Sequence, residues 1–144
     1  MKKALVLVVL SALGLWLAHL HVAAQSYVPV VKIHAPEALS YTAVLDTTPQ
    51  RQACKEANRR FIEPVKARCP DCEVVFARCE RELRGLELAL KRETPLPHPV
   101  VLSPGLRIAV VGALQKAQSS CRAIAGGIAR QGPSASCVAP RVAS

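Results

Sequence analysis

The fold is decided by residues 41–78, which read YTAVLDTTPQRQACKEANRRFIEPVKARCPDCEVVFAR. The run 41–46 predicts a strand, because aromatic and β-branched side chains continue up to a cluster of turn residues. Apolar residues then recur at three- and four-residue spacing from Ala53 to Val65, which is typical of an amphipathic helix. The run 73–78 is again rich in β-forming residues. The segment therefore predicts a strand, a helix and a second strand.

The ends of this helix carry signals of their own. Thr47 with Gln50 would form a capping box, and Thr48 followed by Pro49 is an equally sound start. Pro64 is expected to end or kink the helix just before it, because proline has no backbone N–H to donate. We therefore expect a helix that starts at the two threonines and stops near residue 63.

The C-terminal half predicts a helix, a hairpin, a further helix and a short strand. Ser103-Pro104-Gly105 is a Pro-Gly turn that favours a hairpin. Gly126-Gly127 is expected to stop the last helix. The expected bounds are a helix at 80–92, strands at 100–102 and 106–111, a helix at 113–125 and a strand at 137–138.

A proline-containing lead-in, residues 25–39, precedes the single α/β domain expected at 40–140. Its stretch from Tyr27 to Ile33 could form an edge strand or an extended linker. Pro29 argues against a central strand, because proline cannot donate to the ladder of hydrogen bonds. The sequence thus predicts that the lead-in lies outside the centre of the sheet.

The resulting order, β-α-β-α-β-β-α, predicts a small α/β sandwich on a mixed sheet, stapled by disulfides. This order, with Pro99 just before the hairpin, resembles that of the thioredoxin fold. Enzymes of that family carry Cys-x-x-Cys at the start of the helix after the first core strand. This chain has Thr47-Thr48-Pro49-Gln50 there. The resemblance thus implies a topology without the family's usual active site.

The first 24 residues predict export. Lys2 and Lys3 are followed by the apolar run 4–20, and Val22-Ala23-Ala24 supplies small residues at a cleavage position. An uncleaved anchor is the alternative, because residues 4–24 are about long enough to span a bilayer. Both interpretations place residues 25–144 outside the cytoplasm. The short charged start is typical of bacteria, so we expect a periplasmic domain.

The positive charge of the chain is compatible with an anionic partner, but its many arginines are also what GC-rich coding gives, and we favour that simpler explanation. The formal net charge is +9, and only 3% of the residues are aromatic. Basic residues are mixed with glutamates and are not interleaved with aromatic residues, so a single-stranded nucleic acid is not expected. The predicted first helix has a basic face that could meet an acidic ligand or envelope protein. That face consists of Arg51, Lys55, Arg59 and Lys66.

All six cysteines follow the export segment, so they predict a disulfide framework. A strand from Cys72 to Cys79 would separate these two residues by about 23 Å, too far for a bond between them. If the first two strands are parallel, Cys54 lies near Cys79. The expected pairs are Cys54–Cys79, Cys69–Cys72 and Cys121–Cys137.

Cys69-Pro70-Asp71-Cys72 is the motif that most resembles a catalytic site. A redox dithiol needs a stabilised thiolate, usually at a helix N-terminus. Here the motif precedes a predicted strand and lies beside Asp71 and Glu73, which favours a structural bridge. A zinc site formed by the same two cysteines with Cys79 and His98 is a further alternative.

No other constellation in the sequence indicates catalysis. His34 and His98 each lie beside a proline in predicted loops, and the turn at 110–113 has only one glycine. The sequence therefore predicts a non-catalytic binding or accessory domain of the cell envelope, with no cofactor or metal. A periplasmic thiol–disulfide oxidoreductase using Cys69 and Cys72 is one alternative. A single-pass accessory subunit of the inner membrane is the other.

Overall fold

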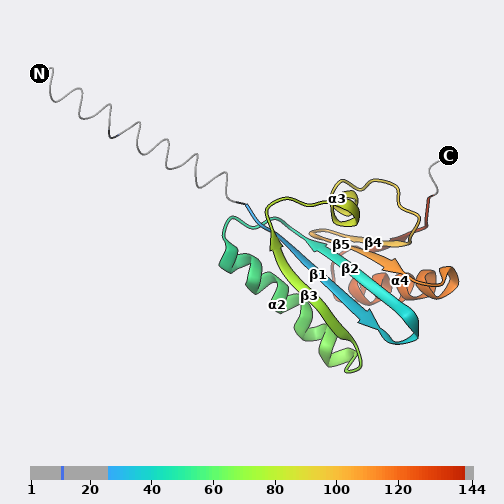
Figure 1. Cartoon of the computed structure of the whole chain (residues 1–144). Helices are drawn as coiled ribbons and strands as arrows, with labels where there is room; N and C mark the ends of the chain where they lie inside the picture. Colours follow the sequence, from blue (N-terminus) through green and yellow to red (C-terminus); the bar gives the residue numbers. More distant parts are fainter. Residues whose placement is uncertain (1–10, 12–25, 142–144) are drawn as a thin grey trace, which may run out of the picture.

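A computed structural model of the chain describes Ser11 and residues 26–141, so the export segment expected at 1–24 lies outside the described residues except for Ser11. The described part forms one six-stranded sheet and three α-helices (Figure 1), which confirms the α/β class. The elements are β1 (Val28–Ala35), a short 3-10 helix (Pro36–Ala38), β2 (Leu39–Leu45), α2 (Arg51–Arg68), β3 (Glu73–Glu80), α3 (Gly85–Lys91), β4 (Val100–Ser103), β5 (Leu106–Val111), α4 (Leu114–Ala129) and β6 (Ser136–Val138).

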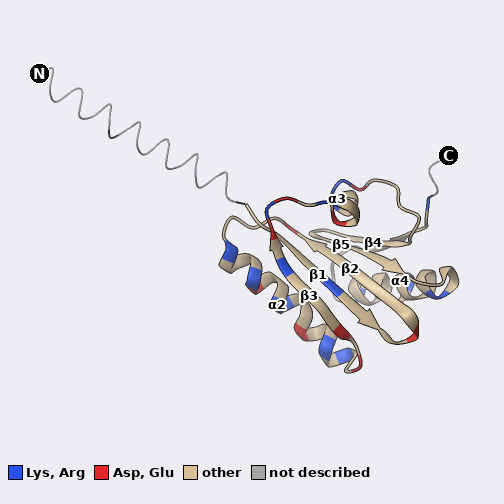
Figure 2. Cartoon of the chain, viewed as in Figure 1, with Lys and Arg blue, Asp and Glu red and all other residues tan. Residues whose placement is uncertain are grey.

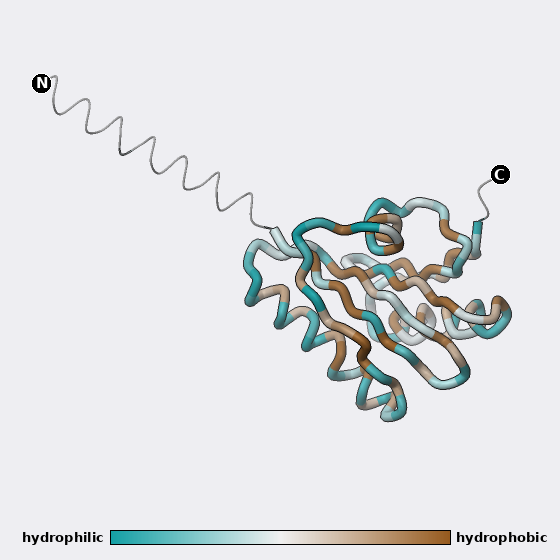
Figure 3. The backbone as a smooth tube through the Cα atoms, viewed as in Figure 1, coloured by the Kyte–Doolittle hydropathy of each residue, from teal (hydrophilic) through white to brown (hydrophobic). Residues whose placement is uncertain are grey.

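Helices cover both faces of the sheet. α2 and α4 pack on one face, where Val101, Val110 and Cys121 are fully buried. α3 packs on the other face through Leu90, against Val30 and other small apolar residues. Successive residues of a strand point to opposite faces, so the strands supply both cores. In Figure 3 the hydrophobic residues accordingly gather in the strands, while α2 is largely hydrophilic.

The strand order is β3-β1-β2-β5-β4-β6, and every neighbouring pair is antiparallel. The mixed sheet expected from the sequence is not formed, because β1 inserts between β2 and β3. Those two strands run in the same direction, as expected, but they do not pair with each other. The likeness to the thioredoxin fold therefore stays one of element order.

The expectation that the lead-in forms an edge strand or a linker is wrong. β1 lies inside the sheet, and Val30 and Val31 are almost completely buried. Pro29 is tolerated there because the hydrogen bonding between β1 and β2 is interrupted beside it. Tyr27 exchanges backbone hydrogen bonds with Thr48. Alternate residues of a strand face the same neighbour, so the backbone nitrogen of Pro29 also faces β2. Regular pairing with β2 starts only at Val30, so no ladder bond inside it is lost.

α2 begins later and ends later than expected. Gln50 is the N-cap residue and makes no capping hydrogen bond through its side chain. The side chain of Thr48 instead donates to the carbonyl of Tyr27, 3.2 Å away, which holds the connection to β1. The helix continues through Pro64 to Arg68. Pro64 and Arg60 are exposed, so the carbonyl that proline leaves without an amide partner can face water.

The other two helices also differ from their expected bounds. α3 begins at Gly85, because Cys79 and Glu80 are held in the ladder with β1. α4 passes through Gly126-Gly127, where the expected stop is wrong. Ile124 and Ile128 pack against the core on either side of the glycines and support the helix there. The hairpin of β4 and β5 and the short final strand are confirmed.

The structure reveals an internal repeat that the sequence did not indicate. β1-β2-α2-β3 and β4-β5-α4-β6 share the order ββαβ, and in each unit the last strand pairs with the first. The units join through the β2–β5 pair. Each also has a disulfide from its helix to its last strand. Leu106 and Cys121 follow their counterparts Leu39 and Cys54 by the same 67 residues.

Candidate binding edge of the sheet

β3 forms the long edge of the sheet, and part of its backbone faces outward. Residues Val28, Val30 and Lys32 of β1 oppose Glu80, Arg78 and Phe76 of β3. Because Tyr27 bonds to Thr48, the backbone N–H and C=O groups of the odd-numbered residues of β1 point toward β2. Those of the even-numbered residues point toward β3 and bond with it. The intervening residues Ala77 and Cys79 therefore turn their N–H and C=O groups away from the sheet. No strand in the described part of the chain pairs with them.

α2 is fixed on top of this edge. A disulfide joins Cys54, near the start of α2, to Cys79, near the end of β3. The two elements therefore run in opposite directions. One turn further along α2, the side chain of Asn58 donates a hydrogen bond of 2.9 Å to the carbonyl of Arg78. Cys54 and Asn58 are both buried, so the helix and the edge strand form one rigid support.

A groove of about 510 Å³ runs along the outer side of α2, beside β3. Ile62 and Ala77 give it an apolar surface, and Lys55 and Lys66 lie toward its two ends. Because α2 and β3 run antiparallel, Lys55 lies toward Cys79, and Lys66 lies toward the start of β3. The groove thus follows the same edge whose backbone is unpaired.

Asn58 also lines this groove and contains a buried atom without a partner. The residue is only 4% exposed, and its side-chain nitrogen donates to the carbonyl of Arg78. Its oxygen Oδ1 accepts no hydrogen bond within the described part of the structure. A buried acceptor left unsatisfied costs about 1–3 kcal/mol. The Asn58 side chain thus fixes α2 on β3 while one of its own acceptors stays unsatisfied beside the groove.

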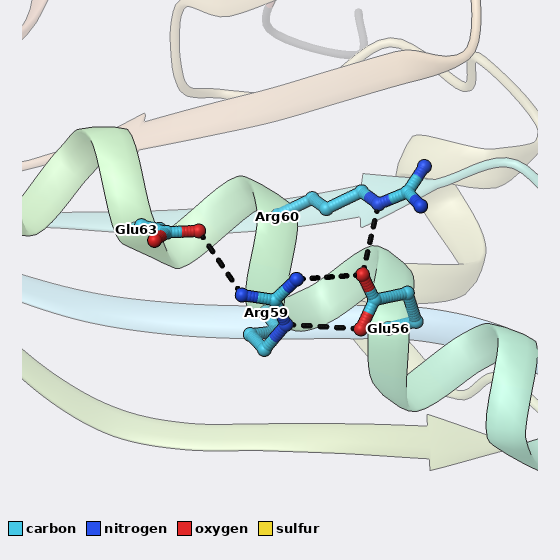
Figure 4. A network of polar contacts seen from close by, with 4 residues as sticks. All are labelled: Glu56, Arg59, Arg60 and Glu63. Atoms are coloured by element: carbon cyan, nitrogen blue, oxygen red, sulfur yellow. Dashed lines mark hydrogen bonds and ion pairs between the residues drawn. The ribbon is translucent and has the colours of Figure 1, made fainter.

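The charges on α2 are partly neutralised within the helix (Figures 2 and 4). Arg59 donates to Glu56 at 2.7 and 2.9 Å and to Glu63 at 3.2 Å, and Arg60 donates to Glu56 at 3.0 Å. Hydrogen bonds from Arg59 and then Arg60 lower the pKa of Glu56 to about 2. The basic face expected from the sequence thus has one member, Arg59, that already has acidic partners.

Lys55 and Lys66 make no ion pair with any described residue. They are the basic groups of the groove that remain available for an acidic partner. Arg51, the fourth member of the expected face, is the first residue of α2 and lines a different hollow. The structure therefore brings together three of the four residues, and of these three Arg59 has acidic partners while the two lysines have none among the described residues.

The hollow that Arg51 lines, of about 730 Å³, has mixed charge. The guanidinium of Arg78 lies 4.0 Å from the centre of the Phe76 ring. Arg81 donates to the hydroxyl of Tyr27 at 2.9 Å and lies over its ring. Three glutamates share this surface with four arginines. Its arginines are thus partly used by aromatic rings and balanced by acids, which makes the α2 groove the stronger candidate.

The cysteines form the three pairs expected from the sequence, with Cα–Cα distances of 5.9 Å for Cys54–Cys79, 5.3 Å for Cys69–Cys72 and 5.6 Å for Cys121–Cys137. The expectation rested on β2 and β3 running in the same direction, and they do. The bridges indicate an oxidising, extracytoplasmic environment. Across the residues that the structure covers, no helix is long and apolar enough to cross a membrane.

The Cys-x-x-Cys motif lies at the end of α2. Cys69 is the C-cap residue and Cys72 comes just before β3. The negative end of the helix dipole disfavours a thiolate there, whereas reactive thiols usually lie at the positive end. This position argues against the redox alternative.

The zinc alternative is wrong, because Cys79 is bonded to Cys54, and Cys69 is bonded to Cys72. The fourth expected ligand, His98, lies in the loop between α3 and β4. Within residues 26–141, no group of three or more His, Cys, Asp or Glu side chains could hold a metal ion. Comparison of the chain with protein-family models, with curated proteins and with solved structures found no match.

Proposed function

We propose that this protein is a non-catalytic binding or accessory domain of the cell envelope, which holds its partner along the edge of β3. The observation that carries the proposal is the outward-facing backbone of Ala77 and Cys79 beside the α2 groove. Exposed strand edges bind extended segments through backbone hydrogen bonds, and neighbouring pockets select the side chains. The export signal that the sequence predicts at residues 1–24 supports a periplasmic location, with or without cleavage.

The chemistry of the groove favours binding over catalysis. Its polar side chains are lysine, arginine, glutamate and asparagine, and none of them is a serine, threonine, cysteine or histidine that could act as a nucleophile. The nearest sulfur atoms are bonded to each other in the Cys54–Cys79 bridge, which holds α2 on β3. A rigid edge of this kind reduces the ordering cost of binding.

Photocrosslinking in exporting cells tests this proposal. A photoreactive amino acid at Val75, on the edge strand, is compared with one at Leu114, at the start of α4. Among residues 26–141, Val75 and Leu114 are the two large apolar residues that are exposed, at 43% and 57%. We expect a crosslinked partner from position 75 and none from position 114. The same partner trapped from both positions would show that the contact does not depend on the edge.

A proline at position 77 should block the interaction. Ala77→Pro removes an N–H that points away from the sheet, so the ladder with β1 keeps its bonds. We expect the crosslink from Val75 to be lost, with the three disulfides still formed and little change in the melting temperature. Ala77→Ser, which keeps the N–H, is the matched control. A crosslink that survives in Ala77→Pro would rule out strand addition at this edge.

A further inference from the structure

We infer that the segment held at this edge is extended and acidic, with two carboxylates flanking an apolar residue in the pattern acidic-x-apolar-x-acidic. This inference rests on the proposed function and specifies its partner. The segment would add to β3 as a seventh strand and direct alternate side chains into the α2 groove. The other side chains would project beside Phe76 and Arg78 on the opposite face.

The spacing follows from the geometry of the groove. Lys55 and Lys66 are eleven residues apart on α2, which is about 16 Å along the helix. On a strand, side chains four residues apart share a face and lie about 13 Å apart. Lysine side chains are long enough to take up the difference. Ile62 lies between the two lysines, so the residue midway between the two acids would contact it and Ala77.

The charge of the groove favours an acidic segment over a second copy of this chain. α2 contains six basic residues and two acidic ones, and both acids already contact Arg59. Pairing of two β3 edges would bring two such helices together. It would also place Glu73 of each strand near Glu80 of the other. Like charges in these positions oppose self-association.

The test uses the full oxidised chain, labelled with ¹⁵N, and a heptapeptide as probe. The peptide Thr-Glu-Thr-Val-Thr-Glu-Thr, acetylated and amidated, places both glutamates and the valine on one face of a strand. We expect saturable shifts of the Ala77 and Cys79 amide signals at low salt, which weaken as the salt concentration rises. Absence of binding would overturn the inference.

Two control peptides separate charge from geometry. In Thr-Lys-Thr-Val-Thr-Lys-Thr the charges are reversed. In Thr-Glu-Thr-Val-Glu-Thr-Thr the composition is unchanged, but the glutamates lie on opposite faces. We expect both to bind at least several-fold more weakly than the probe. Equal binding of the lysine peptide would exclude recognition of acids, and equal binding of the rearranged peptide would exclude the proposed spacing.

Charge reversal locates the interaction. Lys55→Glu with Lys66→Glu should raise the Kd of the probe by about tenfold, because two exposed ion pairs are replaced by contacts between like charges. Arg122→Glu with Arg130→Glu, at exposed positions within α4 and at its C-cap, changes the net charge equally and should leave the Kd almost unchanged. Equal effects of the two double variants would indicate attraction by overall charge and would overturn the inference.

Three further outcomes distinguish the possible occupants and separate this inference from the proposed function. Shifts of Ala77 and Cys79 that appear in the free protein as its concentration rises would identify a second copy as the occupant and overturn the inference. If Ala77→Pro abolishes the crosslink at Val75 but the acidic probe does not bind, only the chemistry assigned to the partner is wrong. If the crosslink survives in Ala77→Pro, the proposed binding along the edge of β3 is wrong.

Discussion

At the scale of residues, some of the charges on α2 are paired within the helix and others are not. Arg59 holds Glu56 and Glu63, and Arg60 shares Glu56. All of these side chains are at least one-third exposed, so each pair contributes little to folding. Their effect is to select Lys55 and Lys66 as the unpaired charges beside β3. The same network gives Glu56 a distinctive acid titration.

Glu56 should make the stability of the protein depend on pH below about 4.5. Its pKa in the folded protein is about 2, below the usual 4.5. Its stabilising contribution is therefore complete above pH 4.5 and is lost as the pH falls toward 2. Urea unfolding across this range should show a smaller loss of stability for Glu56→Gln than for the wild type, and salt should reduce the difference.

The control for this experiment is Glu82→Gln, because the Glu82 side chain is 83% exposed and lies 3.9 Å from a single arginine. Its pH profile should follow that of the wild type. If Glu56→Gln also follows the wild-type profile, the two arginines do not stabilise the Glu56 carboxylate in solution.

At the scale of elements, two of the disulfides differ in the length of chain that they close and in the elements that they join. Cys54–Cys79 fixes α2 on the edge strand and closes a loop of 25 residues. Cys69–Cys72 closes a turn of three residues at the end of α2. Because loop-closure entropy grows with loop length, the first bridge should restrict the unfolded chain far more. It is also the bridge that keeps the α2 groove in register with β3.

Removal of each bridge tests this difference. Cys54→Ala with Cys79→Ala should lower the free energy of unfolding by about 3–4 kcal/mol, and Cys69→Ala with Cys72→Ala by about 1–2 kcal/mol. Urea unfolding measures both. A larger loss from the second pair would mean that the short bridge has a role beyond the turn that it closes.

At the scale of the whole molecule, two ββαβ units share one sheet and the core on each of its faces. The core beneath α3 combines Val30 and Val44 of the first unit with Val100 and Ala109 of the second. Leu90 of α3 contacts both units and is 2% exposed. The units should therefore unfold together, although each has its own helix and its own disulfide.

Leu90→Ala tests this coupling. Loss of a buried leucine should cost about 2–5 kcal/mol. Hydrogen exchange should accelerate to a similar extent at Val31 in the first unit and Val101 in the second, since both are fully buried. Leu114→Ala, at a position that is 57% exposed, is the control and should change little. Faster exchange in one unit only would show that the two units open independently.

Local patterns in the sequence were sufficient for much of this description. The amphipathic spacing of α2, the Pro-Gly turn between β4 and β5, and the three cysteine pairs were all predicted, because each depends on nearby residues or on chain direction. The basic side of α2 was also visible. The sequence did not show that Arg59 is paired and the two lysines are not, because this difference depends on the rotamers of Glu56 and Glu63.

The sequence by itself determined the element types and the covalent frame, since propensity and disulfide reach are local properties. Only the tertiary structure decided that β1 lies inside the sheet and that β3 forms its edge. Strand order depends on pairing between distant segments. The general rule that proline is disfavoured in a central strand takes no account of the interrupted hydrogen bonding between β1 and β2 that accommodates Pro29. The candidate site follows from that order, because the free backbone of Ala77 exists only where β3 has a single neighbour.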